Sequence, residues 1–230
     1  MNNNKTDSTV PDYGKDNLHQ QPLSFFMDKY TETDPAEIAD RIGLETEDDG
    51  RVFLVRYLGH MYRVSQPELN ITPAEEGMTD LLSDNDSARI LLLRYLQLAH
   101  PTPPDGTYVS FRDMPGGDLY FQPFQGRCIF RLLGKYGRRI DVFRSVLASM
   151  GAQKIEYADA CYDVELFDGL FVRFILWEGD DEFPASAQIL FSSNFRNAFE
   201  TYDLAEIGGL CISAFGAEER KLAEKTAENG

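Results

Sequence analysis

Residues 162–191, YDVELFDGLFVRFILWEGDDEFPASAQILF, decide the fold of this chain. Apolar and acidic side chains alternate over residues 162–166, which is typical of a strand with one buried and one exposed face. The dipeptide Asp168-Gly169 that follows is a strong signal for a tight hairpin turn. The stretch therefore begins with two strands of an antiparallel sheet.

The second half of this stretch extends the sheet. Residues 170–177 are apolar on both faces apart from Arg173, which indicates a central strand. Residues 185–191 have the composition of a third strand, and an acid-rich turn connects the two. The sequence therefore predicts a three-stranded meander.

A second hairpin is predicted from RVFLVRYLGHMYRVS, in which Gly59-His60 suits a two-residue turn with glycine first. GTYVSFRDMPGGDLYFQPF, farther along the chain, is expected to form short extended pieces around a turn at residues 115–117. Strands are thus expected in both halves of the chain.

Helices are predicted between and after these strands. TDPAEIADRIGLE offers Asp34 as a cap and Pro35 at the first helical position. DSARILLLRYLQLAH is a strongly apolar helix, with Asp86 or Ser87 as its cap. Three further helices are expected in GRCIFRLLGKYG, IDVFRSVLASMG and YDLAEIGGLCISAF, the first two closed by the glycines Gly137 and Gly151 and the third capped by Asp203.

Runs of strands and runs of helices without a βαβ rhythm indicate an α+β fold, with an antiparallel sheet of hairpins and a meander covered by helices. We expect a disordered polar tail over residues 1–21, a single compact domain over residues 22–215 and a charged C-terminal tail over residues 216–230.

Composition narrows the classes of function. The chain has 230 residues, with 22 basic against 38 acidic side chains and a net charge of −16. Such a chain is repelled by phosphate backbones and anionic lipids, so we expect neither nucleic acid nor membrane as a partner. The three cysteines form no CxxC pair and the three histidines no metal motif, so no cofactor is expected. Free cysteines also favour a cytoplasmic protein.

The acids of the turn after Trp177 form the first candidate site. Glu178, Asp180 and Asp181 could collect a hard cation such as magnesium or calcium. The same acids could instead remain in water as a solvated turn, or could bind arginines, of which Arg112, Arg127 and Arg131 are candidates.

The PGGD turn forms the second candidate site. Gly116 and Gly117 would let backbone amides approach an anion, and the neighbouring Arg112 and Arg127 could add positive charge. Neither phosphate-loop pattern is present, and close packing would explain the glycines equally well. The candidate ligand-binding residues are Arg112, Gly116, Gly117, Asp118, Arg127 and Trp177.

Four segments occur together, in this order, in one bacterial family: GRVFLVRYLGHMYRVS, VSFRDMPGGDLYFQPFQGR, LWEGDDEFPASAQILF and DLAEIGGL. On these motifs the chain resembles the domain-of-unknown-function family 3786, which is common in anaerobes, over residues 25–213. Some members resemble cysteine-rich iron–sulfur proteins in an extra segment that this sequence lacks. The resemblance implies one compact unit and brings no catalytic residue with it.

These observations favour a non-catalytic binding or accessory module in anaerobic bacterial metabolism, which recognises a small molecule or a protein. One alternative is a metal-dependent enzyme that uses the WEGDDEF acids and holds an anionic substrate with Arg112 or Arg127; it requires the two candidate turns to meet. Another is a structural subunit of a larger complex, which a large exposed apolar patch would favour. The sequence leaves open whether any catalysis occurs.

Overall fold

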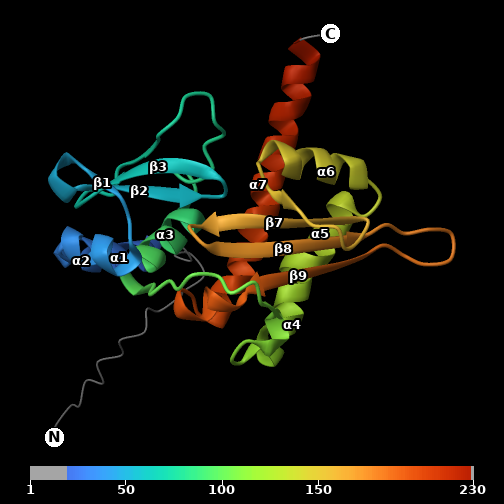
Figure 1. Ribbon diagram of the computed structural model, residues 1–230, viewed down its shortest axis with the longest axis horizontal. Coiled ribbons are helices and arrows are strands. Elements are labelled where there is room, and N and C mark those ends of the chain that lie inside the picture. Colours follow the sequence, from blue (N-terminus) through green and yellow to red (C-terminus); the bar gives the residue numbers. More distant parts are fainter. Residues whose placement is uncertain (1–19, 229–230) are drawn as a thin grey trace, which may run out of the picture.

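The computed structural model describes residues 20–228, which form two antiparallel sheets and the helices that cover them (Figure 1). One hydrophobic core continues through both sheets, so the fold is a single compact α+β domain, as predicted. No helix in the described part of the chain is long and apolar enough to cross a membrane.

The smaller sheet has the strand order β1-β2-β3-β4, with all neighbours antiparallel. Its strands are β1 (Thr46–Glu47), β2 (Val52–Tyr57), β3 (His60–Ser65) and β4 (Ile71–Pro73). The predicted hairpin is present, but its turn is Leu58-Gly59 and not Gly59-His60, because Tyr57 pairs with His60. Leu58 adopts a positive φ of 48° and donates its amide to Leu166 O in the larger sheet, at 2.9 Å. That contact fixes the turn one residue earlier than predicted.

The larger sheet has the order β5-β9-β8-β7-β6 and contains the predicted meander. Its strands are β5 (Tyr108–Ser110), β6 (Gln153–Lys154), β7 (Ala160–Phe167), β8 (Leu170–Trp177) and β9 (Ser186–Ser192). Phe167 pairs with Leu170, so Asp168-Gly169 is the two-residue turn. β8 is central, between β7 and β9, as its apolar composition predicted.

The first helices lie beside the smaller sheet: α1 (Gln20–Glu32), α2 (Pro35–Ile42) and α3 (Asp86–Leu98). Asp34 caps α2 through the amide of Ala36, as predicted. The cap of α3 is Asn85, which accepts from the amide of Ala88, and not Asp86 or Ser87. α1 was not predicted.

Pro115-Gly116 forms a turn as predicted, but the residues that follow it are helical and not extended, which corrects the sequence prediction. The chain forms α4 (Gly117–Phe124), a π-helical segment (Gln125–Ile129) and α5 (Phe130–Tyr136) in direct succession. Gly116 starts α4 with φ 73°, and a Cβ on Gly117 would lie 2.0 Å from Phe111 O. Close packing between α4 and the preceding turn therefore explains Gly117.

The remaining helices are α6 (Ile140–Ser149) and α7 (Thr201–Glu228), with short 3₁₀ turns at Asp48–Gly50, Phe111–Asp113 and Ser193–Asn197. Both helices pack on one face of the larger sheet, where Phe215 of α7 meets Phe174 at 4.9 Å between ring centroids. Gly151 has the predicted positive φ after α6, whereas Gly137 has φ −61° and lies against Ala185. Asp203 lies inside α7, where it accepts from the amide of Glu200.

Candidate functional site: a groove between two helices

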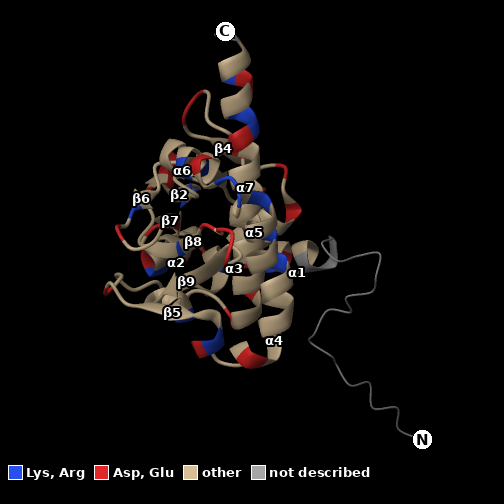
Figure 2. Cartoon of the chain, turned by 90° about the vertical axis from the view of Figure 1, so that its right-hand side faces the viewer, with Lys and Arg blue, Asp and Glu red and all other residues tan. Residues whose placement is uncertain are grey.

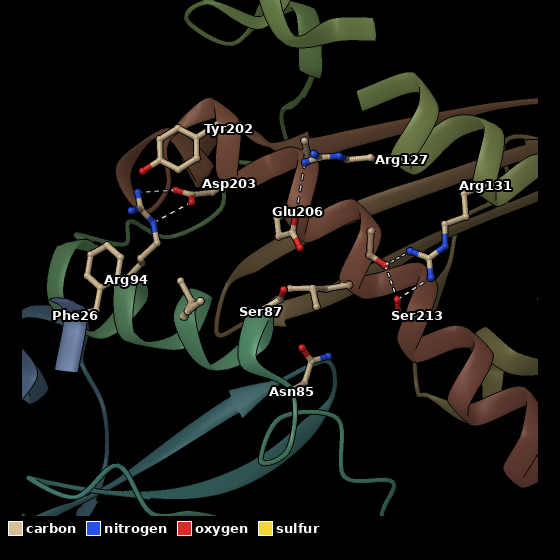
Figure 3. A pocket seen from close by; sticks show the side chains of 14 residues that line it. Phe26, Asn85, Ser87, Arg94, Arg127, Arg131, Tyr202, Asp203, Glu206 and Ser213 are labelled. Atoms are coloured by element: carbon tan, nitrogen blue, oxygen red, sulfur yellow. Dashed lines mark hydrogen bonds and ion pairs between the residues drawn. The ribbon is translucent and has the colours of Figure 1, made fainter. Parts of the chain in front are cut away.

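A groove with a volume of about 790 Å³ runs between α3 and α7 and is walled by the π-helical segment and α5 (Figure 3). Most lining residues of α7 lie on one of its faces, from Tyr202 to Ser213. The ten helical steps from Asp203 to Ser213 span about 15 Å at the rise of an α-helix. The volume is in the range of pockets that hold small organic molecules.

One end of the groove is closed by a buried ion pair. Arg94 of α3 donates from Nη2 to Asp203 Oδ2 at 2.9 Å, and its Nε lies 2.9 Å from Oδ1. The guanidinium also lies between the rings of Phe26 and Tyr202, at 5.2 and 4.8 Å from their centroids. An ion pair held between two aromatic rings is a rigid arrangement, so Arg94 fastens α3 to α7.

The pKa of the Asp203 carboxyl is raised by burial, against the opposing effects of the Arg94 charge and the Glu200 amide. Both carboxylate oxygens are occupied by Arg94, and Oδ2 also accepts from the Glu200 amide at 3.0 Å. The ion pair is therefore a structural part of the groove, and any bound ligand would be contacted by other side chains.

The other wall of the groove contributes two arginines whose positive charges are neutralised by carboxylates less fully than that of Arg94. Arg131 donates to Gly209 O at 3.1 Å and to Ser213 Oγ at 2.8 Å, which are neutral acceptors. Arg127, one turn earlier, lies 3.7 Å from Glu206, and both of these side chains are largely exposed. An exposed pair at that distance contributes little, so Arg127 is free to turn toward a bound anion.

The π-helical segment is packed against α7 through Cys128. Its thiol is buried and donates to Ala205 O at 3.2 Å, and a Cβ on Gly208 would lie 2.7 Å from its sulfur. Burial raises the pKa of Cys128 to about 12, so the thiol stays protonated and is a poor nucleophile. This close contact places Arg127 and Arg131 at the rim of the groove.

Of the predicted ligand-binding residues, only Arg127 lies in the groove. Arg112 stacks on the ring of Phe121 at 3.8 Å, and Asp118 is exposed in the first turn of α4. Trp177 is half-buried at the end of β8, edge-on to Tyr157. Gly116 and Gly117 shape the start of α4, as described above.

The WEGDDEF turn is anchored by the Glu178 amide, which donates to Asp159 Oδ2 at 2.9 Å, and by hydrogen bonds within the loop. Asp180 Oδ1 accepts from the amides of Glu182 and Phe183 at 2.9 and 2.7 Å, and these hydrogen bonds lower its pKa. Glu178 and Asp181 are exposed. Within residues 20–228, no group of three or more His, Cys, Asp and Glu side chains is placed to hold a metal ion. The metal site stays a prediction for which the geometry offers no ligand set.

The two candidate turns do not meet. Figure 1 shows the loop between β8 and β9 at one end of the larger sheet and the start of α4 well below it. The enzyme hypothesis required both turns on one face, so this arrangement speaks against it.

The residues that build the groove were missed as a set, although one signal was present. Arg94 is the only charged residue in the apolar run ILLLRYLQL, and a buried arginine requires a partner. That partner, Asp203, is 109 residues away in the sequence. Only the fold brings the two together.

The structure thus defines an α+β protein with an arginine-rimmed groove between two helices. The chain belongs to the family described as domain of unknown function (DUF3786), whose model matches residues 34–214. No curated protein and no solved structure matches the chain.

Proposed function

We propose that the chain is a non-catalytic binding module for a small organic anion, which lies in the groove between α3 and α7. The observation that carries this proposal is Arg131, whose charge faces only neutral acceptors among the described residues. A carboxylate or phosphate group would accept the remaining guanidinium donors of Arg131, with Arg127 turning to the same group.

The body of the ligand would lie along Ile90, Ala205 and Leu210, which give the groove its apolar lining. Asp203 and Cys128 are committed to Arg94 and to Ala205 O, so neither is available as a base or a nucleophile. Because both groups are engaged in these contacts, the groove favours binding over catalysis. The cytoplasmic setting remains a prediction from the free cysteines, and the anaerobic bacterial setting one from the family resemblance.

A thermal melt with inorganic phosphate, citrate and phenylacetate tests the proposal. At about a hundred times its dissociation constant, a bound anion stabilises the fold by about 2.7 kcal/mol. Arg131→Gln should abolish the increase in melting temperature, whereas Arg138→Gln, an exposed arginine outside the groove, should keep it. If Arg131→Gln keeps the full increase, the groove is not the anion site.

A second readout does not depend on the choice of anion. Native mass spectrometry of the protein purified from its own host should show an added small mass on the wild type. That mass should be missing from Arg131→Gln and present on Arg138→Gln.

A further inference from the structure

The outer side of the α4–α5 segment carries an apolar strip that the groove does not use. Leu119 and Phe130 are 83% and 60% exposed. Pro123, Gly126 and Gly134 are also exposed, and the five residues recur every three or four positions. That spacing places them on one face of the helix, which we call the outer strip. Leu119 has the largest exposed fraction among the exposed large hydrophobic side chains of the described residues, so we consider this face as a candidate interaction surface.

The shape of the outer strip suits another helix. A Cβ added to Gly126 or Gly134 would meet no atom within 4 Å. Phe130 lies one turn from each glycine, so its ring projects between two hollows. Ridges that alternate with hollows are what a packed helix requires of its neighbour.

The surroundings of the outer strip are basic, in contrast to the chain as a whole. Residues 119–139 contain no acid and five basic side chains: Arg127, Arg131, Lys135, Arg138 and Arg139, and the exposed Asp118 lies directly before them. From α7, Glu219 pairs with two of these side chains and Glu206 lies near a third. The five positive charges therefore face two carboxylates, in a chain whose net charge is −16. Figure 2 shows the face that carries these helices.

We propose that the outer strip docks an amphipathic helix of a partner protein, whose apolar side chains pack around Phe130 and whose flanking Asp and Glu side chains face the basic rim. Charge complementarity selects an acidic helix. It also disfavours a second copy of this chain, because two copies of net charge −16 repel each other. The outer strip lies outside the groove, and its basic rim shares Arg127 and Arg131 with the groove wall.

Site-specific photocrosslinking in the native host tests the proposal. A benzophenone side chain is introduced at position 130 and, as the control, at Tyr157, which is 67% exposed and lies edge-on to Trp177. The expected result is a product from position 130 alone, with a partner segment that is helical and flanked by acids. A synthetic peptide of that segment should then bind the full chain, and Phe130→Ala should weaken its binding by about tenfold or more.

Four results would overturn the proposal: no product at position 130, equal products at both positions, a product with a second copy of this chain, or a partner segment without flanking acids. Phe130→Ala should leave any increase in melting temperature caused by an anion unchanged. This separates failure of the docking surface from failure of the groove.

Discussion

The adjacent glycines of α7, Gly208 and Gly209, should respond in opposite directions to alanine. A Cβ on Gly208 would lie 2.7 Å from the sulfur and 3.3 Å from the Cβ of Cys128. On Gly209 the nearest atom would be Arg131 Nη1, at 3.8 Å, which is ordinary contact. The two substitutions are chemically identical and one residue apart, so each is the control for the other.

The magnitudes follow from helix propensity and packing. Replacing glycine by alanine inside a helix raises the free energy of unfolding by about 1 kcal/mol. Gly209→Ala should gain up to that amount. For Gly208→Ala the same gain opposes an overpacking cost of about 1–3 kcal/mol. Cys128 is fully buried and hydrogen-bonded, so it cannot move away easily, and a net loss is expected.

Urea denaturation followed by circular dichroism would measure both variants. Combining Gly208→Ala with Cys128→Ala removes the clashing sulfur. Gly208→Ala should therefore lower the free energy of unfolding less in the Cys128→Ala background than in the wild type. If Gly208→Ala were as stabilising as Gly209→Ala, the inferred contact between α7 and the π-helical segment would be wrong.

Four further predictions concern other parts of the molecule. Arg94→Met should cost about 3–5 kcal/mol by leaving Asp203 buried without its partner, and adding Asp203→Leu should recover most of it; a loss of under about 1 kcal/mol for the single variant would refute the structural role of the pair. Burial raises the pKa of Glu219, but the nearby charges of Arg139 and Lys135 outweigh this effect, so the pKa of Glu219 is below its usual value. The stability from this group is present above the unfolded-state pKa and is lost as the pH falls through the folded one; wild type should therefore lose more stability than Glu219→Gln during acid titration, and parallel losses would contradict this. Gly117→Ala should cost about 1–3 kcal/mol because its Cβ would meet Phe111 O, whereas Gly134→Ala, in open space, should be neutral or stabilising; thermal melts compare the two. Asp180→Asn keeps an acceptor for the amides of Glu182 and Phe183, so its melting temperature should match wild type with and without magnesium, and a magnesium-induced increase confined to wild type would revive the metal site.

Local patterns were enough to predict much of the larger sheet. The alternation over residues 162–166 and the Asp168-Gly169 turn depend on neighbours in the sequence, and the strand and its turn are both present. The predicted exposed face is wrong, because Asp163 is buried in an ion pair with Arg173, and the register shifts between Glu165 and Phe167. The Leu58-Gly59 turn was missed by one residue because Leu58 is held by Leu166, more than a hundred positions away. The helix after the PGGD turn was missed for a similar reason: glycines and a proline indicate a turn, and the close approach of Gly117 to Phe111, where α4 begins, is not visible in the local sequence.

The groove was harder to predict than the fold. The acid cluster after Trp177 was predicted as a candidate site because its residues are adjacent in the sequence. The hydrogen bonds of Asp180, however, stay within its own loop. The groove takes its charged residues from α3, from the π-helical segment with α5, and from α7. Arg131 and Asp203 are unremarkable in their local context, and only the approach of α3 to α7 gives them a common role with Arg94.

The π-helical segment controls the register of everything that follows it in α5. Buried residues recur every four positions there, at Phe124, Cys128, Leu132 and Tyr136. A regular helix of 3.6 residues per turn would rotate such a series by about 120° over its length, and the wider π turn reduces this drift. Deleting one residue between positions 125 and 129 would let regular helical hydrogen bonds run through. It would also turn α5 by about 100° relative to α4, moving Arg131 off the groove and Phe130 off the outer strip together.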